Sequence, residues 1–146
     1  MMCPVQENAS LPRVFCADDN PLVTYALQRY IQRSPDFRWM GCAEDADTLL
    51  EEVAREGCPD IVLMDIDMPG KDPFEAIGEL LARCGSTRVL MYSGMVKREL
   101  IERAIEAGAW GYVSKGDGER ALFEAMRRAL NSELGLSPEA QAVYSA

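Results

Sequence analysis

The chain has 146 residues and a formal net charge of -9, with 24 acidic residues, 15 basic residues and no histidine. This length supports one full hydrophobic core and is too short for two ordinary domains. The acidic balance argues against direct nucleic-acid binding, because affinity for a phosphate backbone depends on clustered Lys and Arg. We therefore expect one acidic domain that makes no direct contact with DNA or RNA.

The N-terminal stretch MMCPVQENASLPRV has neither the basic region nor the apolar region of a signal peptide. No apolar run in the sequence is long enough to span a membrane. The five cysteines are odd in number and scattered, with no CxxC pair and no histidine to complete a zinc set: Cys3, Cys16, Cys42, Cys58 and Cys84. We expect a soluble, cytoplasmic protein whose cysteines are small residues in a reducing compartment, with Cys16 and Cys42 in the core.

Short apolar runs alternate with longer helical patterns from the start of the chain. RVFCA at 13–17 predicts a strand, after which Asn20 supplies an N-cap and Pro21 the first turn of a helix. FRWMGC at 37–42 alternates as a second strand. Apolar residues at helical spacing follow until Gly57 ends the second helix.

The stretch IVLMDIDMPG at 61–70 begins with a continuous apolar run, which predicts a third strand buried on both faces. The third helix begins at Asp72–Pro73 and ends at Gly85. RVLMY at 88–92 predicts the fourth strand, and a helix then leads to Gly108. WGYV at 110–113 predicts the fifth strand, and apolar residues from Ala121 to Ala129 line the fifth helix.

Five β-α units of this kind predict an α/β fold, a (βα)5 doubly wound open parallel sheet with the flavodoxin-like strand order 2-1-3-4-5. They are too few for a closed eight-stranded barrel. We expect the domain to cover residues 12–132, between an N-terminal extension at 1–11 and a C-terminal tail at 133–146.

Polar residues follow the predicted strands where such a sheet forms its ligand crevice, beyond the carboxyl ends of the strands. Asp18 and Asp19 follow the first strand, Asp65 follows the third, Ser93 closes the fourth and Lys115 follows the fifth. We expect these five side chains to converge. Each one alone has a plainer interpretation as a helix cap, a turn residue or a solvated charge, but their coincidence at one sheet edge favours a site.

Three carboxylates in one small crevice cannot all stay ionised at neutral pH without a compensating positive charge. Mg²⁺ takes oxygen ligands and is typically held by one or two carboxylates plus a phosphate, so Asp18, Asp19 and Asp65 predict a Mg²⁺ site that awaits a phosphoryl group. Lys115 and Ser93 suit the remaining phosphoryl oxygens. Asp65 is then a candidate nucleophile, because a carboxylate that attacks phosphorus forms an aspartyl phosphate.

Four segments, taken together and in this order, resemble the receiver domain of bacterial response regulators, the CheY-like family. They are ADDN at 17–20, LMDIDMPG at 63–70, MYSG at 91–94 and AGAWGYVSK at 107–115. The resemblance implies that Asp65 accepts a phosphoryl group from a phosphohistidine on a partner histidine kinase or histidine phosphotransferase. It also implies that Mg²⁺ is held by Asp18, Asp19, Asp65 and the backbone carbonyl of Asp67.

By the same resemblance, Ser93 and Lys115 contact the phosphoryl group and Tyr112 is an aromatic switch that turns inward on phosphorylation. The surface made by the fourth helix, fifth strand and fifth helix would then change and bind an output protein or a second copy of the chain. We expect the chain to catalyse only its own phosphorylation and dephosphorylation. Since the chain has no histidine, the phosphohistidine donor is expected to be another molecule.

Two positions depart from the usual receiver pattern: Gly116 stands where many receivers have Pro, and Pro73 where a Gly commonly follows the Asp. The first is familiar among regulators with a LuxR-type helix-turn-helix, and LGLSPEAQAV at 134–143 resembles their linker helix. Ser137–Pro138 is also a good helix start. The residues up to Ala146 contain no basic recognition helix, so if this is the whole protein its output passes through a partner or a dimer.

Three other functions stay open at this point. DID at 65–67 also resembles the nucleophile motif of haloacid-dehalogenase-type phosphatases, although those enzymes place it near the N-terminus. A receiver-like binding module that has lost phosphorylation would need no Mg²⁺ and would bind its partner equally without Asp65. A flavodoxin is weaker still, because the acidic ADDN would repel a flavin phosphate.

Overall fold

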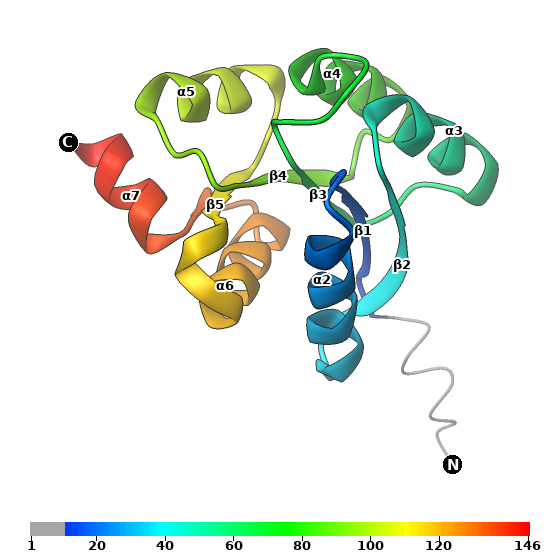
Figure 1. The fold of residues 1–146 in the computed structure, drawn as a ribbon, viewed down its shortest axis with the longest axis horizontal. Helices are drawn as coiled ribbons and strands as arrows, with labels where there is room; N and C mark the ends of the chain where they lie inside the picture. The colour runs from blue at the N-terminus through cyan, green and yellow to red at the C-terminus, as the bar shows by residue number, and fades with distance from the viewer. Residues whose placement is uncertain (1–10) are drawn as a thin grey trace.

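The computed structural model describes residues 11–146 as a parallel six-stranded sheet with the strand order β2-β1-β3-β4-β5-β6 (Figure 1). The strands are β1 (Arg13–Ala17), β2 (Arg38–Ala43), β3 (Ile61–Met64), β4 (Arg88–Ser93), β5 (Gly111–Ser114) and β6 (Gly135–Leu136). The helices are α2 (Pro21–Arg33), α3 (Ala46–Glu56), α4 (Pro73–Arg83), α5 (Arg98–Ala107), α6 (Gly118–Leu130) and α7 (Pro138–Ser145), with a 3-10 turn, η1, at Lys115–Asp117. The predicted fold class and the order of the first five strands are confirmed.

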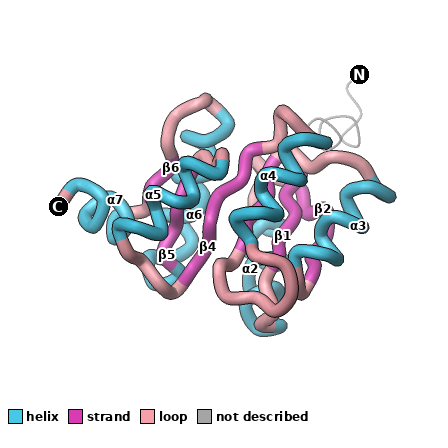
Figure 2. Tube along the Cα trace, turned by 90° about the horizontal axis from the view of Figure 1, so that it is seen from above, coloured by secondary structure: helices cyan, strands magenta, loops and turns pink. Residues whose placement is uncertain are grey.

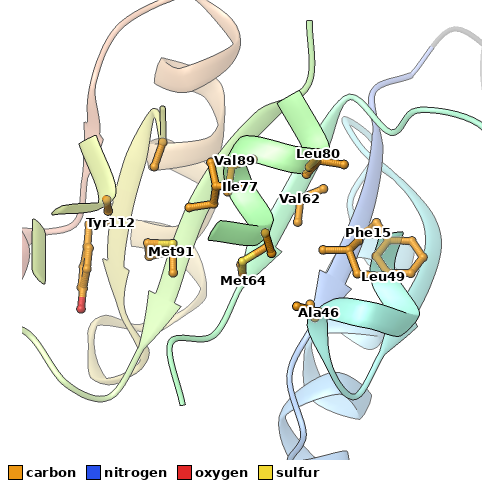
Figure 3. Packing of buried hydrophobic residues seen from close by; sticks show 14 of the residues in the cluster. Phe15, Ala46, Leu49, Val62, Met64, Ile77, Leu80, Val89, Met91 and Tyr112 are labelled. Carbon is orange, nitrogen blue, oxygen red and sulfur yellow. The ribbon is translucent and has the colours of Figure 1, made fainter. Parts of the chain in front are cut away.

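Helices cover both faces of the sheet: α3, α4 and α5 lie on one face, and α2 and α6 lie on the other (Figures 1 and 2). Successive residues of each central strand enter opposite cores. In β3, Val62 and Met64 pack beneath α3 and α4 (Figure 3), whereas Ile61 and Leu63 pack against α2 and α6. Burial on both faces explains why this strand is continuously apolar in the sequence.

The element boundaries follow local signals. The Asn20 side chain accepts a hydrogen bond from the Leu22 amide at the start of α2, and Asp72 does the same for Phe74 at the start of α4. Strands β2 and β5 each begin one residue later than the alternation indicates, at Arg38 and Gly111.

The C-terminal tail forms part of the sheet, which the sequence did not predict. Residues Gly135 and Leu136 pair in parallel with Gly111 and Tyr112 of β5 as a sixth strand, and α7 begins at Pro138 as its helix signal predicts. Gly135 lets the chain pass close to α6, since a Cβ atom there would lie 2.3 Å from the carbonyl oxygen of Ala125 in that helix. The tail is therefore packed onto the domain through its own core residues.

The expectation for the cysteines is partly wrong. Cys58 and Cys84 form a disulfide between the segment that leads into β3 and the segment that leads into β4. These segments are adjacent because β3 and β4 pair side by side, a neighbourhood that their separation of 26 residues does not reveal. Cys16 is buried as predicted, but Cys42 is exposed because β2 is an edge strand. Cys3 and most of the predicted N-terminal extension lie outside the described residues.

Over residues 11–146, no helix combines the length and the apolar character that a membrane crossing requires.

Candidate functional site

A cleft of about 780 Å³ opens where four strands end, at the switch point between β1 and β3. Its lining includes Asp18, Asp19, Asp65, Asp67, Ser93 and Lys115. The structure thus brings together, from four separate segments, all the predicted site residues except Tyr112, which lies in the adjoining core.

Backbone hydrogen bonds that continue past the strand ends fix the two buried carboxylates. The Asp18 amide donates to the Ala43 carbonyl at 3.0 Å, and the Asp65 amide donates to the Ala17 carbonyl at 2.9 Å. Asp18 is 2% exposed and Asp65 is 5% exposed, whereas Asp19 lies at the surface. Each carboxylate is therefore held by the sheet and does not depend on a mobile loop.

The cleft carries more negative charge than its one lysine offsets. Lys115 Nζ lies 2.8 Å from Asp18 Oδ2 and 3.6 Å from Asp65 Oδ1. Asp18 Oδ2 is buried. Its contact with Lys115 is an ion pair that lacks hydrogen-bond geometry, so this oxygen has no hydrogen-bond partner. Burial, and then the nearby Asp18 carboxylate, raise the pKa of Asp65, while Lys115 opposes this shift. A further cation would relieve the repulsion.

The donor set fits a hard divalent cation. Asp18, Asp19 and Asp65 each offer a carboxylate oxygen, and these oxygens lie within 4.8 Å of one another. Mg²⁺ prefers oxygen ligands and keeps several waters, which suits a site with two buried carboxylates and one at the solvent edge. The buried Asp18 Oδ2 already faces a cation in this structure, the Lys115 ammonium at 2.8 Å, which fits a position that favours positive charge.

Mg²⁺ is expected to stabilise the fold. At ten times its dissociation constant, a ligand that binds only the native state adds about 1.4 kcal/mol to the free energy of unfolding. Urea unfolding with and without Mg²⁺ measures this gain. Asp18→Asn, which keeps the oxygen that accepts from the Asn20 amide, is expected to remove most of it. An equal gain in the variant would contradict the assignment of Asp18 as a ligand.

Ser93 and Tyr112 hold the loop between β4 and α5 from two sides. The Ser93 hydroxyl accepts a hydrogen bond from the Met95 amide at 3.0 Å, and the Tyr112 hydroxyl donates to the Met95 carbonyl. Tyr112 is 1% exposed and packs in the core beside Met91 (Figure 3), and burial raises its pKa to about 12. The predicted switch residue is therefore already inward in this structure. The sequence offers no signal for the role of Met95, because both hydrogen bonds use its backbone amide and carbonyl.

Comparison with known proteins defines the family. The model of the response regulator receiver domain matches residues 14–127, and the chain belongs to this family. The chain is 32% identical over 127 residues to the response regulator GacA of Pseudomonas viridiflava, a match that covers 87% of the chain and 59% of that relative. The chain thus spans about three-fifths of the length of this curated relative.

Two solved structures show the same fold. A LuxR-family two-component response regulator from Aurantimonas sp. SI85-9A1 has a TM-score of 0.86 and 31% identity, over 93% of this chain and 96% of that one. The isolated receiver domain of RcsB from Salmonella enterica serovar Typhimurium, solved with the phosphomimetic BeF3-, has a TM-score of 0.82 over 92% of this chain and 99% of that one. The second is 16% identical and supports the fold alone.

Proposed function

We propose that Asp65 accepts a phosphoryl group from a phosphohistidine on a partner histidine kinase or histidine phosphotransferase. The observation that carries this proposal is the position of the Asp65 carboxylate, at the end of a buried strand, 3.6 Å from Lys115 and beside a second buried carboxylate. A capping role would not require this burial or raise the pKa of Asp65. Membership of the receiver family supports the same residue.

The transfer balances as a single displacement at phosphorus. A carboxylate oxygen of Asp65 forms the new P–O bond while the P–N bond to the donor imidazole breaks, and the imidazole leaves with the bonding electron pair and takes up a proton. Phosphoryl transfer depends mainly on alignment and charge neutralisation, which require no separate base on the protein.

The other cleft residues have supporting roles in this proposal. Lys115 exchanges its contact with Asp18 for a phosphoryl oxygen, and the Ser93 hydroxyl donates to another. Asp18, Asp19, Asp65 and the Asp67 backbone carbonyl would hold Mg²⁺. When bound, this ion offsets the charge of the carboxylates and of the phosphoryl oxygens.

The phosphoryl group carries a charge of roughly -1.5 to -2 in place of the single charge of the Asp65 carboxylate, and its oxygens extend further into the cleft, which changes the contacts that Ser93 and Lys115 prefer. Because Ser93 and Tyr112 both bind the Met95 backbone, a movement of Ser93 reaches Tyr112 and the start of α5. We assign output to the surface of α5, β5 and α6, which would bind an output protein or a second copy of the chain. RcsB, a structural neighbour that shares the fold, has been solved as a dimer.

We assign residues 12–132 to the phosphoacceptor module and 133–146 to the segment that leads from it. We place the protein in the cytoplasm, where partner kinases present their phosphohistidine. In that compartment Cys58 and Cys84 would be kept as thiols, so their disulfide is expected in oxidised, purified protein.

Turnover distinguishes this function from that of a phosphatase. With Mg²⁺ and an excess of p-nitrophenyl phosphate, a haloacid-dehalogenase-type enzyme releases many equivalents of nitrophenol. We expect this chain to release none above its background, and to take up one phosphoryl group per chain from acetyl phosphate. Sustained release that disappears in Asp65→Asn would overturn the receiver function in favour of the phosphatase.

A further inference from the structure

The C-terminal segment, residues 135–146, covers part of the surface that we assign to output. Leu136 and Ala140 belong to the same buried core as Tyr112, and Val143 and Tyr144 pack against that core. The ribbon and the Cα tube both place α7 beside α5 at the β5 and β6 end of the sheet (Figures 1 and 2). A partner that needs the bare face of α5 and β5 cannot reach it while α7 occupies this position.

Polar contacts fasten the start of α7 to both ends of the turn that carries Lys115. Before the turn, the Ser114 amide donates to Ser137 Oγ at 2.9 Å, and the Ser114 hydroxyl donates to Glu139 Oε1 at 2.6 Å. At its other end, Asp117 Oδ2 accepts from the Glu139 amide at 2.8 Å. The turn η1 and the first turn of α7 therefore share one hydrogen-bond network.

This network is built into the fold. Ser114 is 2% exposed and Ser137 is 1% exposed, and the Ser137 amide also donates to the Tyr112 carbonyl at 3.1 Å. Buried hydrogen bonds of this kind are directional and costly to leave unmade. A displacement of η1 must therefore either carry α7 with it or break these contacts.

The far end of the segment is held more weakly. Arg98 of α5 donates to the Ala146 carbonyl and lies over the Tyr144 ring, 6.0 Å from its centroid. Its side chain is 52% exposed, so these contacts are open to water. Among the polar contacts of α7, those at Ser114 and Ser137 therefore hold it most firmly, and the buried side chain of Ala140 adds apolar packing.

We infer that the C-terminal segment is an intramolecular inhibitor of the α5 and β5 face and is released when Lys115 binds the phosphoryl group. The inference rests on the proposed function, since it is the attraction of the phosphoryl oxygens that moves Lys115 away from Asp18. In this structure Lys115 contacts Asp18, and the attached segment lies seated over Tyr112. When Lys115 turns to the phosphoryl group, η1 moves, the buried network loses its geometry and α7 leaves the face. Coupling is reciprocal, so a weakened network must favour binding at the cleft.

Hydrogen exchange with a phosphoryl mimic tests the inference. The full chain is incubated with Mg²⁺ and beryllofluoride, ¹⁹F NMR reports whether beryllofluoride is bound, and amide exchange is followed over 138–145. We expect exchange in α7 to accelerate at least about fivefold when the mimic is bound, the lower end of typical coupling between sites. Bound fluoride with unchanged exchange in α7 would overturn the inference and leave the proposed function standing. Absence of bound fluoride would overturn both.

Two variants test the reciprocal effect. Ser137→Ala removes the acceptor of a buried amide, and the milder Glu139→Ala removes only the acceptor of the Ser114 hydroxyl. Each is expected to bind beryllofluoride at least about fivefold more tightly than the native chain. Gln141→Ala is the matched control, because Gln141 is exposed on α7 and its side chain donates to Ser145 Oγ of the same helix, outside the network. Unchanged affinity in Glu139→Ala, or an equal gain in Gln141→Ala, would contradict the coupling.

Discussion

Replacement of Asp65 by Asn is expected to abolish phosphoryl acceptance and, at the same time, to stabilise the unphosphorylated protein. An amide of the same shape keeps the packing of the strand end but cannot attack phosphorus as a carboxylate does. The loss should be complete within the sensitivity of intact mass measurement. Among residues 11–146 the one other buried carboxylate in contact with Lys115 is Asp18, whose Oδ2 is already paired with Lys115 at 2.8 Å.

The stability gain follows from the sign of the pKa shift. Burial and Asp18 raise the pKa of Asp65 in the folded protein above its ordinary value, so folding favours the protonated form. The native state is then most favoured at low pH, and this contribution is lost as pH rises through the raised pKa. At neutral pH without Mg²⁺, Asp65→Asn should therefore raise the free energy of unfolding by about 1 kcal/mol. Urea unfolding at pH 7 with a chelator measures it.

Asp67→Asn is the control for both effects. Asp67 lies two residues further along and is exposed, and its proposed contact with Mg²⁺ uses the backbone carbonyl, which the substitution keeps. We expect this variant to accept one phosphoryl group and to have nearly native stability. If Asp67→Asn lost acceptance while Asp65→Asn kept it, the nucleophile would be misassigned.

The second large effect is expected from the disulfide. Closing a loop between residues 26 apart stabilises a fold by about 3.5 kcal/mol in the chain-entropy relation. We expect a reductant, or Cys58→Ser, to lower the free energy of unfolding by roughly this amount, since Cys58 is exposed and its replacement leaves the core intact. Urea unfolding of oxidised and reduced protein measures the difference.

Cys42→Ser provides the matched control, because Cys42 is exposed and has no disulfide partner among residues 11–146. It is expected to unfold like the native chain and to respond equally to reductant. A reductant that leaves the native unfolding midpoint unchanged would show that Cys58 and Cys84 contribute no cross-link in solution.

Most of the fold could be predicted because its signals are local. Continuous apolar runs indicate strands buried on both faces, and Asn20–Pro21 and Asp72–Pro73 mark helix starts that the structure shows. The gathering of Asp18 and Asp65 follows from topology alone, because parallel strands present their carboxyl ends at one edge.

The features that escaped prediction depend on contacts between distant segments. The neighbourhood of the strands decides both the pairing of Cys58 with Cys84 and the packing of Leu136 beside Tyr112. The second contact also requires Gly135, which lets the chain pass close to Ala125. The Tyr112 hydroxyl binds a backbone carbonyl at Met95, where the side-chain type carries no information. The exposure of Cys42 reflects the edge position of β2.

Intact mass after incubation with Mg²⁺ and acetyl phosphate tests the central claim most directly, with the native chain and Asp65→Asn measured side by side. We predict the addition of one phosphoryl group to the native chain and none to Asp65→Asn, with the addition lost when a chelator removes Mg²⁺. No addition to the native chain, or an equal addition to both proteins, would contradict the assignment of Asp65 as the phosphoacceptor.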